Sequence, residues 1–361
     1  MEHQSSVSDI DNNHTMPKHH PLDKNGAVSQ HDEDTLNIPL DNVQQSTDTP
    51  TKTGEEDPYW TEGLKNPGWL STCALFLVTF SIFGILFCWG VFQPYYLDHV
   101  YAGQTDVFRI AFTGTSAQAI TTLLGLPLSW VIRRIGYKGT MTIGMLLFPS
   151  SLILASFATQ LWHVLITQGI LLGVGAGFCF SSCFMLPSQW FIQKRGLVNG
   201  IGNTGSCVGA LCLSPLAQHL IDTLGYRNAL RVLGTIVFAL LSLATLLARA
   251  RYPPSSTPTI MQKSEKQSFR SSPLYSIPFA LALVFSLLAP FGYVAPFYLM
   301  PTYTMQVVGS SASMGAALVS VGMATGVVSR LGFGFISDRI GQINTLFIVT
   351  LISGRYTSDV F

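Results

Sequence analysis

One arginine lies within an apolar segment, where burial of its positive charge costs free energy. Arg330 lies within the apolar segment Ala312–Ile336, which is long enough to cross a membrane. An arginine at the centre of a membrane helix costs about 2.5–3.5 kcal/mol on insertion scales, so such a residue usually marks a ligand or a partner. A guanidinium can hold a carboxylate through two parallel hydrogen bonds. Arg330 is therefore a candidate for binding an organic anion; the alternative is that its long side chain extends to the nearer membrane surface.

Four uncharged polar side chains also fall inside apolar segments: Gln118, Gln168, Asn199 and Asn203. Each would lose hydrogen bonds if it faced lipid, so we expect all four to face the interior of a helical bundle. Gln118 and Asn203 are the better candidates for contact with a ligand. Hydrogen bonds between helices would satisfy the same residues equally well.

Aromatic residues and prolines occur together in the segment Ile277–Met300. Pro290 and Pro296 predict a bent helix, because proline removes a backbone hydrogen bond and crowds the preceding turn. Tyr293 and Phe297 lie near this bend and are candidates for lining a binding site. The alternative is that they pack in the core.

A charged turn occurs twice, each time directly after the second apolar segment of a group. The copies are Arg133-Arg134-Ile135-Gly136 and Asp338-Arg339-Ile340-Gly341. Such a repeat indicates two related helix bundles placed end to end, as in membrane transporters. We expect Asp338 to cap or pair across the interface between the bundles, Arg134 and Arg339 to hold helix ends, and Gly136 and Gly341 to allow tight reversals. These residues would then form a gate; the alternative is that the arginines only fix the orientation of the chain.

The composition excludes several classes of protein. Only 11% of the 361 residues are charged and 48% are apolar, whereas ordinary soluble domains carry about 25% charged residues. A net charge of +1 without a basic face argues against nucleic-acid binding. The six cysteines lie in apolar segments, away from histidines and carboxylates, so we expect neither disulfides nor a metal site. We find no nucleotide-binding motif and no pair of nucleophile and base, and expect no cofactor and no enzyme activity.

The apolar segments predict the fold class. A helix that crosses a hydrocarbon core of ~30 Å needs about 20 mostly apolar residues. Eight segments qualify: Leu70–Tyr95, Ile110–Ile132, Gly139–Ala158, Leu161–Phe184, Leu197–Ile221, Ala229–Ala248, Ile277–Met300 and Ala312–Ile336. We expect an all-α membrane protein with a complete six-helix first half and an incomplete second half. A ninth stretch, Thr345–Ile352, would cover only ~12 Å as a helix before polar residues follow, so we expect the chain to be truncated within this helix.

The regions between these segments complete the layout. Residues 1–68 are polar and poor in large apolar side chains, which predicts a disordered tail. Residues 69–250 hold the first bundle, 251–275 form a linker between the bundles, and 276–361 hold the partial second bundle. Loops on the side of the tail carry more lysine and arginine than the opposite loops, so we expect the tail in the cytoplasm. The first set is Arg133, Arg134, Lys138, Lys194, Arg195, Arg249, Arg251, Lys263, Lys266, Arg270 and Arg339, and the second is Arg109, Arg227 and Arg231.

Four further motifs lie within or beside the predicted helices. The first helix opens with Pro67-Gly68-Trp69 and closes with Trp89-Gly90-Val91-Phe92-Gln93-Pro94-Tyr95-Tyr96. The fourth carries glycines within Gln168–Gly177, and Gln189-Trp190-Phe191 begins the link to the fifth. Together with the repeated turn, these motifs resemble the major facilitator superfamily, and within it the monocarboxylate-porter-like branch common in fungi. The resemblance covers Pro67 to Ile352.

The resemblance implies a secondary transporter of the plasma membrane, embedded in the lipid bilayer, that moves a monocarboxylate or another small organic anion by alternating access. Arg330 would match the family's eighth-helix arginine. In animal members a lysine on the first helix and an aspartate one turn before that arginine serve proton coupling. Here the first helix has Phe87-Cys88-Trp89 and the second position is Gly326, so proton coupling stays open. The alternative function is a non-transporting sensor or assembly partner, or an inactive truncated product.

Overall fold

The computed structural model describes residues 63–252, apart from Leu64, Ala102, Gln104 and Ile192, together with residues 312–360 and the isolated positions Leu281, Val284 and Gly309. Every regular element in these ranges is a helix. The predicted tail up to residue 62, the predicted linker beyond Tyr252 and the predicted segment Ile277–Met300, except for two isolated positions, lie outside the described residues.

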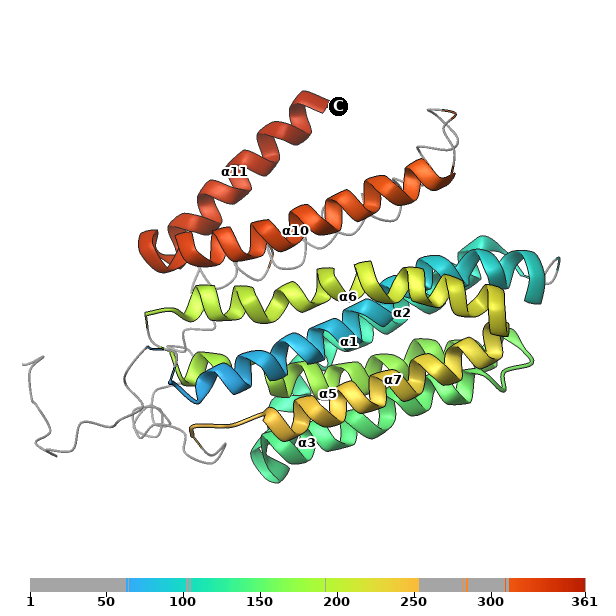
Figure 1. Ribbon diagram of the computed structural model, residues 1–361, viewed down its shortest axis with the longest axis horizontal. Helices are drawn as coiled ribbons and strands as arrows, with labels where there is room; N and C mark the ends of the chain where they lie inside the picture. Colours follow the sequence, from blue (N-terminus) through green and yellow to red (C-terminus); the bar gives the residue numbers. More distant parts are fainter. Residues whose placement is uncertain are drawn as a thin grey trace, which may run out of the picture. The chain divides into compact units, whose positions relative to one another are not determined.

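The six predicted segments of the first bundle are all present as helices (Figure 1). In chain order the elements are α1 (Gly68–Tyr95), η3 (Tyr96–Val100), α2 (Val107–Leu123), α3 (Gly125–Ala155), α4 (Leu161–Val164), η4 (Leu165–Leu171), α5 (Leu172–Phe184), η5 (Pro187–Gln189), α6 (Arg195–Leu224), α7 (Tyr226–Leu247), α10 (Ala312–Ile340) and α11 (Gln342–Val360). Within the described ranges, five stretches have the length and apolar composition of membrane-crossing helices: Gly68–Tyr95, Pro127–Ala155, Leu161–Gln189, Arg195–Leu224 and Tyr226–Leu247. The predicted all-α membrane fold is confirmed.

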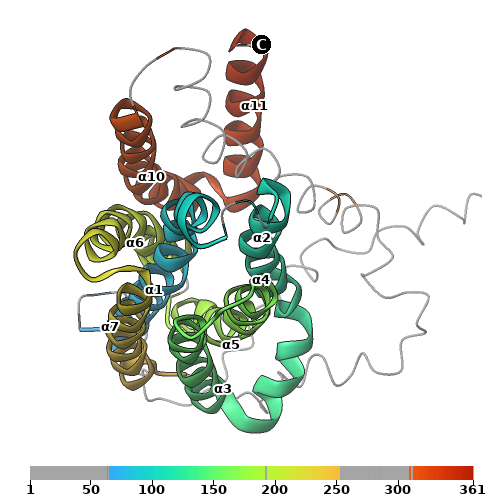
Figure 2. The ribbon, with the colours of Figure 1, turned by 90° about the vertical axis from the view of Figure 1, so that its right-hand side faces the viewer.

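The second and third predicted segments meet inside one element, α3. The backbone of Gly136 leaves helical geometry there, with φ 81° and ψ 168°, a conformation that is essentially restricted to glycine. The parts of α3 before and after Gly136 run in different directions (Figure 2). The first charged turn therefore changes the direction of the chain at its glycine, as the sequence predicts.

Glycines on α6 allow its backbone to touch α1. A β-carbon at Gly205 would lie 2.2 Å from the carbonyl oxygen of Phe76, and one at Gly209 would lie 2.3 Å from that of Phe80. Both distances are shorter than any van der Waals contact, so these positions tolerate only glycine without rearrangement. The hydroxyl of Thr79 donates to the carbonyl oxygen of Gly202 over 2.7 Å at the same contact. Small residues thus bring the two helices together, which is a common packing device in membranes.

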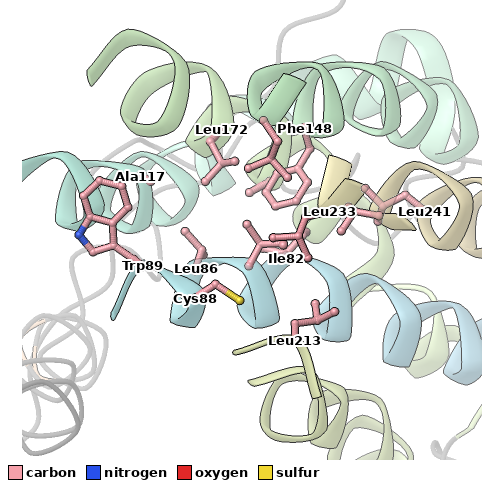
Figure 3. Packing of buried hydrophobic residues seen from close by; sticks show 14 of the residues in the cluster. Ile82, Leu86, Cys88, Trp89, Ala117, Phe148, Leu172, Leu213, Leu233 and Leu241 are labelled. Atoms are coloured by element: carbon pink, nitrogen blue, oxygen red, sulfur yellow. The ribbon is translucent and has the colours of Figure 1, made fainter. Parts of the chain in front are cut away.

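A buried apolar cluster fills the first bundle, α1 to α7. Ile82 and Leu86 on α1 lie opposite Phe148 on α3, with Leu172 and Leu233 from α5 and α7 beside them (Figure 3). Ile82 and Phe148 are both completely buried. α1 packs mainly on α6 and α7, and α3 packs on α5 and α7.

The last two helices differ in part from expectation. α10 runs beside α6 (Figure 1) and includes the whole predicted segment Ala312–Ile336. The prediction for the ninth helix was wrong: α11 has 19 residues and continues through the polar stretch after Ile352. Most polar residues are within about 0.7 kcal/mol of alanine in helix propensity, and a single glycine costs about 1 kcal/mol. Polarity at positions 353–359 therefore does not end a helix.

The conformation of Gly136 leads to a stability prediction. Gly136→Ala should lower the free energy of unfolding by about 1–3 kcal/mol, because a β-carbon is strained at this φ and ψ. Thermal unfolding of the detergent-solubilised chain measures the effect. The matched control is Gly139→Ala, at a helical position where the new β-carbon would make an ordinary 3.5 Å contact with Ile135. Equal unfolding temperatures for the two variants would contradict the assignment of Gly136 as a required turn residue.

Candidate functional site

Asp338 joins α10 to the start of α6. The first N–H groups of a helix have no acceptor within the helix, and α6 begins at Arg195. Oδ1 of Asp338 accepts the N–H of Gly196 over 2.6 Å, and Oδ2 accepts that of Leu197 over 2.8 Å. The negative charge also lies at the positive end of the α6 dipole. The carboxylate therefore caps a helix 141 residues away in the sequence, on the other side of the predicted linker.

The cap forms because the two backbones touch. A β-carbon at Gly196 would lie 2.7 Å from the carbonyl oxygen of Gly334, and one at Gly334 would lie 2.8 Å from that of Gly196. One turn further along α6, a β-carbon at Gly200 would lie 2.5 Å from the carbonyl oxygen of Arg330. We call this contact, formed by Gly196, Gly200 and Cys207 on α6 and by Gly326, Arg330, Gly334 and Asp338 on α10, the α6–α10 seam.

Arg330 lies at this seam. Its Nη1 donates to the sulfur of Cys207, and Gly326 packs against the same sulfur. A thiol is a weak acceptor, so a carboxylate would be a much stronger partner for the guanidinium. Arg330 is half-buried and stands ten residues, or ~15 Å, before the end of α10 at Ile340.

Asn203 shares the face of α6 that meets Arg330. Gly200, Asn203 and Cys207 are spaced three and four residues apart, which places them on one side of the helix. Nδ2 of half-buried Asn203 donates to the carbonyl oxygen of Asn199 over 2.9 Å. The structure thus brings Asn203 and Arg330, both predicted site residues, to the same helix contact. Asn199 is instead tied to Ser188, to whose hydroxyl its amide nitrogen donates over 2.8 Å.

The remaining predicted ligand contacts lie elsewhere. Gln118 is half-buried on α2, which packs mainly against α5 and η4 in the first bundle. Gln168 is buried, and its amide nitrogen donates to the hydroxyl of Tyr96 over 3.0 Å. Tyr293 and Phe297 lie outside the described residues.

The two arginines of the charged turns make contacts within their own helices. The guanidinium of Arg134 lies 3.8 Å from the ring centre of Trp130, and that of Arg339 lies 4.5 Å from the ring centre of Phe335. Both arginine side chains are exposed. Gly341 has a φ of 97° and forms the turn from α10 into α11. Of the predicted gate residues, Asp338 forms hydrogen bonds across the seam, to the N–H groups of Gly196 and Leu197.

Gln189 and Trp190 form hydrogen bonds to two other parts of the first bundle, and these bonds were not predicted from the sequence. We call this contact the joint. The amide nitrogen of Gln189 donates to the hydroxyl of Tyr137 over 3.0 Å, and its oxygen accepts the N–H of Arg251 over 3.1 Å. The indole of Trp190 donates to the carbonyl oxygen of Arg249 over 2.9 Å. The joint therefore ties the start of the second part of α3 to the chain leaving α7. The motif Gln189-Trp190-Phe191 marks this region in the sequence, but its hydrogen-bond partners cannot be identified from the sequence alone.

The described residues offer no evident metal centre. No three His, Cys, Asp or Glu side chains in this part of the chain come together in a way that could hold a metal ion. Cys179 is buried, and its thiol donates to the carbonyl oxygen of Met141 over 3.5 Å. The seam and its arginine are thus the feature with the clearest potential to bind a ligand.

Comparisons with known proteins identify the family of the chain. The sequence profile of the Major Facilitator Superfamily matches residues 59–354. The MFS-type transporter hasB of Aspergillus fumigatus is 27% identical over 79% of this chain and 65% of its own length. The aspyridones efflux protein apdF of Emericella nidulans is 28% identical over 85% of this chain and 61% of its own. The probable transporter MCH2 of Saccharomyces cerevisiae is 27% identical over 79% and 60%. The chain thus spans less than two thirds of the length of these three relatives.

The cap on α6 leads to a prediction about the seam. Asp338→Ala should weaken the seam by about 0.5–2 kcal/mol, the usual value of a lost N-cap, and should expose Cys207 more often. In a background whose other five cysteines are alanine, a maleimide should then modify Cys207 about 2- to 30-fold faster, since 1.4 kcal/mol corresponds to a factor of ten. Arg339→Ala is the control, because its exposed side chain packs on its own helix. An unchanged rate in Asp338→Ala would show that the carboxylate does not hold the seam.

Proposed function

Because the chain belongs to the major facilitator superfamily, we propose that it carries a small organic anion across a membrane by alternating access. Its family and its apolar helices make it an integral multi-pass membrane protein. The names of its relatives support transport: one is an efflux protein for aspyridones and others are called transporters. We therefore propose that the substrate is an organic molecule of the size of a metabolite.

The position of Arg330 is the observation that supports an anion as the substrate. Its guanidinium lies at the seam between α6 and α10, where Nη1 donates to the sulfur of Cys207. A guanidinium at this position can hold a substrate carboxylate through two charge-assisted hydrogen bonds. Asn203, on the same face of α6, would offer a further polar contact. Monocarboxylates are the first compounds to test, and other organic anions follow from the same chemistry.

The cap by Asp338 supports alternating access as the mechanism. Transporters of this kind rock one helix bundle against the other around a central site, so they need a contact that forms in one state and breaks in the next. Two hydrogen bonds and a dipole interaction at the end of the seam fit that need. We propose that the cap closes one side of the transport path and opens when the bundles separate there.

The charge of the loops supports an orientation. Lysines and arginines are concentrated on the side where α1 and α6 begin and where α10 ends. The positive-inside rule then places the tail and the Asp338 cap in the cytoplasm. The plasma membrane is the proposed location. The competing function is a non-transporting sensor or assembly partner, which predicts no solute flux.

Removal of the guanidinium tests the binding role. In proteoliposomes, Arg330→Gln should reduce uptake of labelled monocarboxylates about 10- to 150-fold, because a hydrogen bond to a charged group contributes about 1.5–3 kcal/mol. Arg330→Lys should restore part of the rate, since lysine keeps the charge and loses the bidentate geometry.

The control for this experiment is Arg339→Gln, which removes a charge of the same kind from the exposed end of α10. Equal transport by wild type and Arg330→Gln would remove Arg330 from the mechanism. No flux above that of empty vesicles, for any organic anion tested, would favour the non-transporting function.

A second measurement tests the orientation. In a cysteine-free background, an impermeant maleimide added to intact cells should label Arg227→Cys and leave Lys194→Cys unlabelled until the cells are opened. Both side chains are exposed, and they lie near opposite ends of α6. Labelling of Lys194→Cys from outside would reverse the proposed topology.

A further inference from the structure

Trp89 carries a buried hydrogen-bond donor that the residues described by the structure do not satisfy. Its side chain is only 7% exposed. Its indole nitrogen has no acceptor within hydrogen-bond distance among the described residues. Buried polar groups are almost always hydrogen-bonded, to protein or to ordered water. An indole N–H in this position therefore points to an acceptor that none of the described residues supplies.

A small cavity adjoins this indole. Its volume is about 20 Å³, and it lies inside the first bundle, lined mostly by apolar side chains of α1, α2, α3, α5 and α7. Trp89 and Gln168 are the two lining residues with polar side chains. About 10–15 Å³ is enough for one water molecule. The cavity therefore fits one water and is too small for an organic substrate.

Gln168 supplies the second polar group. It is 4% exposed and stands in η4, a π-helical turn between α4 and α5. Its amide nitrogen donates to the hydroxyl of Tyr96 over 3.0 Å, so its amide oxygen is the end that offers an acceptor. π-Helical turns often occur at functional positions because they carry an extra residue in the helix.

Gly114 shapes the remaining wall of this site. A β-carbon at Gly114 would lie 2.4 Å from both the indole nitrogen and Cδ1 of Trp89. The polar edge of the indole thus occupies the space that a side chain on α2 would take. This fit holds the indole against α2, and Trp89, Gly114 and Gln168 all line the cavity.

We propose that the cavity is a binding site for a single structural water. The water accepts a hydrogen bond from the indole nitrogen of Trp89 and donates one to the amide oxygen of Gln168. It links α1 to the π-helical turn, and the Gln168–Tyr96 hydrogen bond extends the link to η3. These bonds hold the first bundle together as one body, independently of any substrate.

A double-mutant cycle tests the bridge in the full chain by thermal unfolding in detergent. Trp89→Phe and Gln168→Leu should each lower the unfolding temperature, by about 2–4 °C for a loss of the size of one hydrogen bond. Their combined effect should fall short of the sum, because the second change removes a bridge that the first has already broken. The control pair is Trp89→Phe with Gln189→Leu, the same glutamine change at the far end of the bundle, which should be additive.

Additivity of Trp89→Phe with Gln168→Leu would overturn the proposal, as would a higher unfolding temperature for Trp89→Phe, the result expected for removal of an unpaired donor. An experimental map of the wild-type chain that resolves ordered water gives a second test, which does not depend on the variants folding. Density for a water within hydrogen-bond distance of both Trp89 and Gln168 supports the site. A dry cavity in such a map would rule it out.

Discussion

Two N–H groups at the start of α6 find their acceptors on another helix, and the arrangement of α10 depends on this contact. A helix end needs partners for its first N–H groups. Asp338 provides both oxygens at 2.6 and 2.8 Å, and it reaches them only because Gly196 and Gly334 let the backbones touch. With α10 fixed at that end, its helical path brings Arg330 against Cys207. The proposed anion site is thus a geometric consequence of the cap.

The two kinds of helix contact in this protein differ in how easily they separate. Within the first bundle, buried apolar side chains such as Ile82 and Phe148 fill the space around α1, and glycines of α6 touch its backbone. At the seam, glycines again allow close approach, and a charged cap and an arginine lie beside a small apolar cluster that includes Cys207, Ala210 and Met323. Charged and polar contacts can be replaced by water or substrate when the helices part. The first kind of contact suits a rigid body, and the second suits a moving interface.

Much of the fold could be predicted from the sequence, because membrane helices are read from apolar runs of about 20 residues. Five of the six segments of the first bundle correspond to stretches that could cross a membrane, whereas the second, Ile110–Ile132, is divided between α2 and α3. The rule failed for α11, because hydropathy indicates where a helix can cross a membrane and says little about where it ends. In the candidate site, a charge inside an apolar segment singled out Arg330, and the repeated turn singled out Asp338. Their partners could not be predicted, because Gly196, Leu197 and Cys207 are more than 120 residues away in the sequence. The type of these residues does not indicate which distant residue they contact. The unpaired indole of Trp89 likewise appears only when its surroundings are known.

The central claim is that the α6–α10 seam exists in two states, closed by the Asp338 cap and open. The most direct test is a distance measurement between spin labels at Lys194 and Arg339, which flank the cap on exposed positions, with the chain in liposomes. We predict two populations of distances, a short one with the cap formed and a longer one with the helices apart. A single narrow distance, unchanged across the organic anions tested, would contradict this account.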